Sequence, residues 1–234
     1  DNISGATPSV FYAHSASRKA TSEILAQLPG YKLDFFAAGC VTLWNKYAPE
    51  QVAELSKAGF TVINDYNKIS ENASAKRIGV IAADKDIQPI MNGRGDFLPS
   101  TTRQAIDFLS SKSKKGFFLM VEGAQIDWGS HNNDVKYTVT EVIDFDKAVS
   151  EALKFADKDG HTLVIITADH ETGGMTIPNG NYAKKSVKAL YTTAGHSGIM
   201  VPVYAYGPYS QEFRGVQENI DIHKKIIEIL SKAK

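Results

Sequence analysis

The sequence predicts an α/β protein: a three-layer α/β/α sandwich with a largely parallel central sheet. Short apolar or β-branched runs alternate with amphipathic helical patterns along the chain, which is typical of parallel sheets covered by helices. Two of these runs lead directly into Asp, Glu and His residues, and open α/β sheets collect functional residues at such strand ends. The 234 residues include 43% hydrophobic ones, enough for one substantial core.

The N-terminal half contains five predicted elements before a long connection. They are a helix at 15–28, a strand at 33–40, a helix at 48–58 and strands at 61–64 and 77–82. Residues 87–99 hold two glycines and two prolines, which predicts a loop. Ser100 and Thr101 are expected to cap a helix to about Ser111, which leads into a buried strand at 116–120.

The C-terminal half continues the alternation. Apolar residues recur at helical spacing over residues 133–157, and Gly160 ends that helix. Strands are predicted at 162–167 and 201–206, a polar surface loop at 179–186 and a final helix at 221–232. No domain boundary is evident, so we expect residues 1–234 to form a single α/β domain.

Composition excludes several partners. Lys and Arg total 26 against 26 Asp and Glu, so the net charge is zero. This charge balance does not indicate binding to nucleic acid or to an anionic membrane. No apolar run is long enough for a transmembrane helix, and no signal peptide is visible. The single cysteine, Cys40, excludes an internal disulfide and is expected to be a small buried residue.

The segment from residue 121 to 131 is the most informative motif. It places Glu122, Asp127 and His131 within ten residues, directly after the apolar run at 116–120. If a helix begins there, Asp127 and His131 are four residues apart on one face and can bind one cation. Carboxylate with imidazole suits zinc, whereas Glu122 alone would suit magnesium. The alternative is a helix N-terminal acid with a surface histidine.

Two further clusters repeat this chemistry. The strand at 162–167 leads to Asp169 and His170, which can share a metal only if the chain leaves the strand there. His196 lies in a loop of small residues before the strand at 201–206, and alone it would be an ordinary polar residue. Three such clusters indicate a two-metal hydrolytic site.

These motifs resemble the alkaline phosphatase family. The resemblance is carried by MVEGAQIDWGSHNND at 120–134, TADHETGG at 167–174, GHSG at 195–198 and ATPSVFYAHSASR at 6–18. It implies two zinc ions and one magnesium ion. Asp127, His131 and His196 match the ligands of the first zinc, Asp169 and His170 those of the second, and Thr7 and Glu122 those of magnesium. Arg18 matches the residue that clamps phosphate, a task suited to a planar guanidinium; without the resemblance it would be an ordinary helix arginine.

The sequence departs from the family at the nucleophile. Relatives carry an Asp-Ser nucleophile and a bridging aspartate upstream of the Ala-Thr-Pro segment, whereas no Asp-Ser or Asp-Thr pair occurs in these residues. We therefore expect a domain truncated at its N-terminus and inactive alone. Gly5 stands where many relatives carry an acidic residue or histidine that orients magnesium-bound water. Trp128, where others carry Lys or His, either walls the pocket or alters metal binding.

The activity implied for the complete enzyme is hydrolysis of phosphate monoesters through a phosphoserine intermediate, with release of inorganic phosphate. The family resemblance alone implies a periplasmic or secreted location. A homodimer is compatible with the same resemblance. The alternative is a non-catalytic metal- and phosphate-binding fragment or subunit, which the missing nucleophile would favour.

Overall fold

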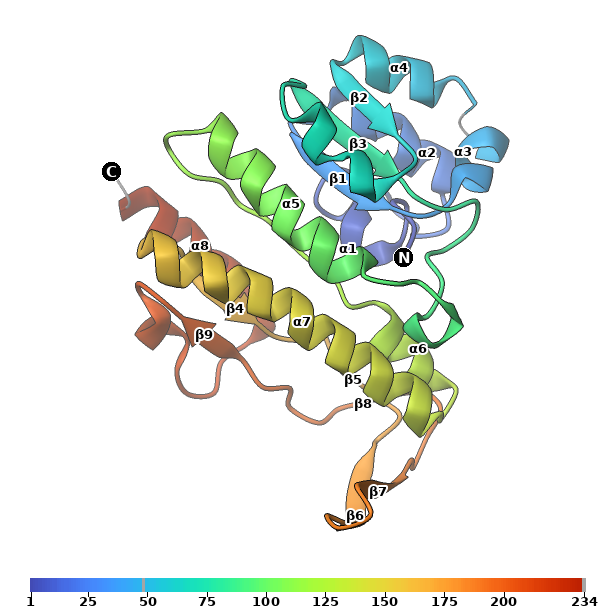
Figure 1. Cartoon of the computed structure of the whole chain (residues 1–234), viewed down its shortest axis with the longest axis vertical. Helices are drawn as coiled ribbons and strands as arrows, with labels where there is room; N and C mark the ends of the chain where they lie inside the picture. The colour runs from blue at the N-terminus through green and yellow to red at the C-terminus, as the bar shows by residue number, and fades with distance from the viewer. Residues whose placement is uncertain (48, 233–234) are drawn as a thin grey trace. The chain divides into compact units, whose positions relative to one another are not determined.

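A computed structural model of the chain describes residues 1–47 and 49–232 (Figure 1). The chain divides into two compact units, Asp1–Gln125 and Ile126–Lys234. Whether the two units make up the single domain expected from the sequence stays a prediction. Among the described residues, no helix combines the length and the apolar character needed to cross a membrane.

The first unit contains a parallel three-stranded sheet in the order β1-β3-β2. The strands are β1 (Phe35–Ala38), β2 (Phe60–Ile63) and β3 (Arg77–Ile81). Each lies within or beside the strand predicted for it, and the parallel pairing confirms the expected sheet type for this unit.

One face of this sheet lies under three helices, α2 (Thr21–Gln27), α3 (Val41–Tyr47) and α4 (Gln51–Lys57). Phe36 and Phe60 point to this side and pack with Trp44, which is buried. Gly79 lies between them, and a Cβ there would come 2.5 Å from the Phe36 ring. Only a glycine therefore fits beneath that ring.

The opposite face packs on α5 (Phe97–Lys112), through Ile78 and Val80 against Phe108 and Leu109. Alternate residues of each strand thus enter separate hydrophobic clusters, as the two-residue period of a strand requires. Helices cover both faces of the sheet, so this unit has the expected three layers (Figure 1).

Several helix boundaries in this unit differ from the prediction. A short α1 (Ala6–Ser9) is followed by turns, and α2 begins only at Thr21, not at residue 15. Ser15 and Ser17 bond to nearby backbone instead, which competes with helix formation. α5 begins at Phe97, so Ser100 and Thr101 lie inside it and do not cap it. The sequence also missed α3, and Ala48, the first residue of the helix predicted there, lies outside the described residues.

The strand predicted at residues 116–120 is wrong. Phe117 and Leu119 pack against the cluster under α5, but Phe118 is 55% exposed. A strand exists only where its backbone pairs in a ladder, and within the described residues this run joins no sheet. It is an irregular segment in which packed and exposed side chains alternate, as they would along a strand.

In the second unit, two helices follow each other closely. α6 (Gln125–His131) begins at the unit boundary, and α7 (Val135–Asp159) is the long amphipathic helix predicted from the sequence. The Asp134 side chain caps α7 by accepting from the Tyr137 N–H at 3.0 Å. Gly160 ends the helix with φ of 72°, the left-handed conformation that glycine adopts readily.

The strand pairs of the second unit are antiparallel, unlike the three-stranded sheet of the first unit. The chain reverses between partners: β4 (Val164–Ile166) pairs with β9 (Tyr204–Tyr206), and β5 (Glu171–Thr172) pairs with β8 (His196–Ser197). The segment predicted as a loop at 179–186 is exposed, but it includes parts of the hairpin strands β6 (Thr176–Asn181) and β7 (Ser186–Leu190).

The remaining elements are a C-terminal helix and short 3₁₀ turns. α8 (Asn219–Lys232) begins two residues before the predicted start. The 3₁₀ turns are Leu28–Gly30, Tyr66–Lys68, Ser70–Asn72, Ile90–Asn92 and Ser210–Phe213. Cys40 follows β1 and is buried as a free thiol, which confirms its predicted role.

Candidate metal centre

The first two candidate ligands lie on α6. Asp127 and His131 are one helical turn apart, and His131 Nε2 lies 3.4 Å from Asp127 Oδ1. The helix predicted from their spacing is therefore present, with both side chains on one face. Gly129 lies between them, where a Cβ would come 2.8 Å from the Thr138 nitrogen, so a glycine allows this close approach of α6 to the start of α7.

The second nitrogen of His131 determines which ring atom is available for a ligand. His131 Nδ1 lies 2.6 Å from the carbonyl oxygen of Ala194. A carbonyl oxygen only accepts, so Nδ1 is the donor of this bond, and in the neutral ring Nε2 then has the lone pair. That lone pair is on the side of Asp127 and His196, and a backbone contact of this kind is common in metal-binding histidines.

Asp169 and His170 follow the end of β4. The chain leaves that strand after Ile166, which satisfies the condition for neighbouring residues to point the same way. Asp169 Oδ2 lies 3.1 Å from His170 Nε2, and Asp169 is largely exposed whereas His170 is partly buried.

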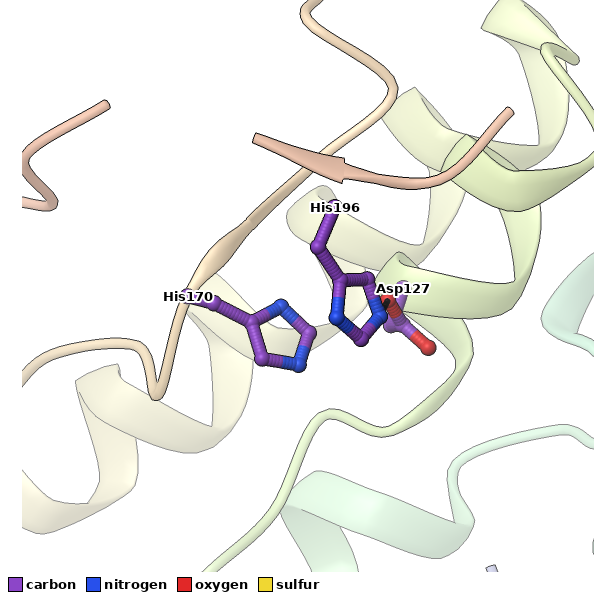
Figure 2. A group of neighbouring side chains, drawn as sticks. All are labelled: Asp127, His170 and His196. Atoms are coloured by element: carbon purple, nitrogen blue, oxygen red, sulfur yellow. Dashed lines mark ion pairs between the residues drawn. The ribbon is translucent and has the colours of Figure 1, made fainter. Parts of the chain in front are cut away.

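His196, on β8, joins the two groups. Its Nε2 lies 3.2 Å from His131 Nε2 and 3.9 Å from Asp127 Oδ1, so the expected proximity of these three residues is observed. Its ring also stacks on His170 with centroids 3.6 Å apart. Figure 2 shows both rings beside the Asp127 carboxylate, and potential ligand atoms of these three residues lie within 4.8 Å of one another.

This grouping brings together ligands that the resemblance assigns to two neighbouring ions. His170 was expected at a second zinc, yet its ring lies against His196, a ligand expected at the first. The five residues Asp127, His131, Asp169, His170 and His196 thus form one continuous cluster. Their division between two ions stays a prediction.

Sequence reasoning missed three residues around the cluster. Thr172 donates its hydroxyl hydrogen to Asp127 Oδ1 at 2.5 Å and lies 3.3 Å from His170 Nδ1. Glu171 and Ser197, which directly follow His170 and His196, hydrogen-bond to each other. The only signal in the sequence was their position next to the predicted ligands.

Four of the other candidate residues belong to the first unit, and Trp128 belongs to the second. Thr7 lies on α1, Gly5 precedes that helix, and Glu122 lies in the irregular segment before α6. Arg18 is exposed in a turn, not in the predicted helix. A Cβ on Gly5 would come 2.1 Å from the Asp1 carboxylate. Their assignments to magnesium and phosphate stay predictions, as does the role of Trp128, which is half-buried on α6.

The donor set of the cluster fits zinc. Three imidazoles and two carboxylates come together, and potential ligand atoms of Asp127, His170 and His196 lie within 4.8 Å of one another. Nitrogen and carboxylate oxygen ligands are those that catalytic zinc sites use, while magnesium prefers oxygen alone.

Known proteins are similar to this chain in sequence and fold. The family model for alkaline phosphatase matches residues 49–192. Alkaline phosphatase 4 of Bacillus subtilis is 32% identical over 307 residues, which covers 99% of this chain and 66% of the relative. The chain therefore spans about two thirds of the length of the curated relatives that it matches best in coverage.

Solved structures agree. Alkaline phosphatase from the Antarctic bacterium TAB5 has a TM-score of 0.91 at 40% identity, over 98% of this chain and 69% of that chain. A variant of the TAB5 enzyme with Mg bound in its M3 site gives the same TM-score and identity, over 98% of this chain and 70% of that one. These similarities confirm the α/β fold class, and because the family model covers more than half of its residues, the chain belongs to the alkaline phosphatase family.

Proposed function

We propose that the protein hydrolyses phosphate monoesters with the help of metal ions held by the histidine–aspartate cluster. The observation that carries this proposal is the convergence of Asp127, His170 and His196 within 4.8 Å, in a chain of the alkaline phosphatase family. Metal ions bound there would neutralise charge on the phosphoryl oxygens and favour ionisation of the attacking group.

The cluster would hold two zinc ions between its ligand sets. Asp127, His131 and His196 would supply the first set, and Asp169 with His170 would supply part of the second. The hydrogen on His131 Nδ1 is held by Ala194, which keeps Nε2 oriented toward the metal. Thr7 and Glu122 would contribute oxygen ligands to magnesium, the type of ligand that this ion prefers.

Arg18 would bind the substrate. Its exposed guanidinium can form two parallel hydrogen bonds to phosphate oxygens, which a lysine ammonium cannot do. Recognition through the phosphate group accommodates many leaving groups, so we expect broad activity on phosphate monoesters and product inhibition by inorganic phosphate.

In the whole protein, the reaction would pass through a phosphoserine. The resemblance implies a serine that follows an aspartate, and these residues contain no such pair. The residues described here would therefore provide metal ligands and the phosphate clamp, while the nucleophile would come from elsewhere in the whole protein.

The proposal is tested first by metal binding. Zinc affinity would be measured by competition with a chromogenic chelator for the native chain, His196→Ala and the control His223→Ala, which alters an exposed histidine on α8. We expect zinc to bind more tightly than magnesium, and His196→Ala to weaken zinc at least tenfold. Equal zinc affinity in all three proteins would contradict the proposed site.

A further inference from the structure

The two ligand loops of the cluster are joined by a very short ladder. β5 and β8 contain two residues each, with Glu171 opposite Ser197 and Thr172 opposite His196. A two-residue pairing is weak by itself. Three further backbone bonds join the loops, from the Gly173 N–H to the Gly195 carbonyl oxygen and from the Thr192 and Thr193 N–H groups to the Gly173 carbonyl oxygen. Side-chain interactions add to this backbone pairing.

The two faces of the ladder differ in chemistry. Residues opposite each other share a face, so Thr172 and His196 lie on one side and Glu171 and Ser197 on the other. Thr172 bonds to Asp127, and His196 lies among the other candidate ligands. Glu171 and Ser197 therefore lie on the side away from the cluster and are not its ligands.

Both carboxylate oxygens of Glu171 are used. Oε1 accepts from the backbone N–H groups of Gly174 at 2.8 Å and Met175 at 3.3 Å. Oε2 accepts from the Ser197 hydroxyl. A carboxylate can accept all three bonds, and bonds to a charged acceptor are stronger than neutral ones.

The turn after β5 is shaped to make these bonds. Gly173 and Gly174 have φ of 89° and 57°, the left-handed region in which a side chain is strained. A Cβ at Gly173 would also come 2.6 Å from the Tyr191 ring. The two glycines turn the chain so that the N–H groups of Gly174 and Met175 point back to Glu171.

An exposed segment separates the two loops in sequence. The hairpin β6–β7 lies between Met175 and Tyr191, and every residue of β6 is exposed. Both ends of this hairpin connect directly to the ligand loops, so a displacement of the hairpin would displace both loops. The Glu171–Ser197 bond lies at its base and links the two loops directly.

We propose that Glu171 is a positioning residue that, through Ser197, holds the His196 loop at a fixed distance from His170. The inference rests on the proposed metal-binding function. Glu171 fixes its own loop through Gly174 and Met175 and the opposite loop through Ser197. The imidazoles of His170 and His196 are thereby preorganised for metal ions, at no cost in ligand reorganisation when the ions bind.

The test uses Ser197→Ala, which removes only the link to the opposite loop and leaves the bonds from Gly174 and Met175 in place. Zinc affinity and the visible absorption spectrum of the Co²⁺-substituted chain would be measured, the latter because it reports ligand geometry. We expect about tenfold weaker zinc binding and an altered Co²⁺ spectrum. Ser197→Thr, which keeps the hydroxyl, should restore both.

Two further variants complete the design. Glu171→Ala should weaken zinc at least as much as Ser197→Ala, and the double variant should be little weaker than Glu171→Ala because the two residues form one link. Ser186→Ala, on the exposed β7, is the control and should match the native chain. If Glu171→Ala fails to fold, Ser197→Ala decides the question.

The outcomes separate the two proposals. Native zinc affinity and an unchanged Co²⁺ spectrum in Ser197→Ala would overturn the positioning role while leaving the metal site intact. Failure of the native chain itself to bind zinc would overturn the proposed function, and the positioning role with it.

Discussion

Thr172 is the residue with the most direct influence on a predicted ligand. Its hydroxyl donates to Asp127 at 2.5 Å from a buried position on β5. Thr172→Val keeps the β-branched shape and removes this bond, so we expect an intact fold and about tenfold weaker zinc binding. The measurement is chelator competition with thermal unfolding in parallel. Thr176→Val, on the exposed β6, is the control; equal affinities in the two variants would refute the role.

The proximity of candidate ligands could be predicted from the sequence, but the contacts around them could not. Asp127 and His131 are four residues apart, and a helix places such residues together without further information. Thr172 is 45 residues from Asp127, and Ser197 is 26 from Glu171. Contacts between distant residues depend on how loops pack, which local patterns do not specify. For the same reason, the stacking of His196 on His170 was not predicted.

At the scale of elements, prediction succeeded where a pattern has a single structural solution. The parallel strands β1 and β3 are apolar on both faces because helices cover both, and α7 has a continuous apolar stripe between a capping Asp134 and Gly160. It failed at residues 116–120, where an apolar run has the composition of a strand but no partner in a described sheet. Pairing is a property of two segments, and a single segment does not reveal it.

The segment that carries Thr7 is held by Tyr12. Tyr12 is 3% exposed and donates to the Ile3 carbonyl oxygen at 2.9 Å, which closes a loop around α1. Burial raises the pKa of Tyr12 well above its usual value of 10.0. The unfolded chain therefore loses this proton first, and the contribution of the neutral phenol to stability, complete below pH 10.0, is lost as pH rises further.

Tyr12→Phe tests this contribution. The variant keeps the ring but lacks the hydroxyl, so near neutral pH it should be about 1 kcal/mol less stable than the native chain. Above pH 10.0 its stability should fall less steeply, so that the two curves converge. Urea unfolding at several pH values measures both effects. Tyr182→Phe, at a fully exposed site, should follow the native curve, and parallel curves for Tyr12→Phe would contradict the argument.

At the scale of the whole molecule, family membership and catalytic competence are separate properties. The chain matches an Antarctic alkaline phosphatase with a TM-score of 0.91, yet it spans 69% of that chain. Its metal-ligand motifs are present, while an Asp-Ser nucleophile pair is not. Zinc binding and turnover of substrate are therefore separate predictions for these residues, each with its own measurement.

This separation predicts the activity of these 234 residues alone. Loss of a nucleophile typically lowers turnover by several orders of magnitude, and the Asp-Ser pair that the resemblance implies does not occur in these residues. We expect hydrolysis of a chromogenic phosphate monoester at no more than ~10⁻³ of the rate of a complete family member. A segment bearing the Asp-Ser pair of a relative, fused to the chain or added separately, should raise this rate. Zinc binding without any gain would favour a metal- and phosphate-binding module, whereas near-full activity of the chain alone would place the nucleophile among the residues described here.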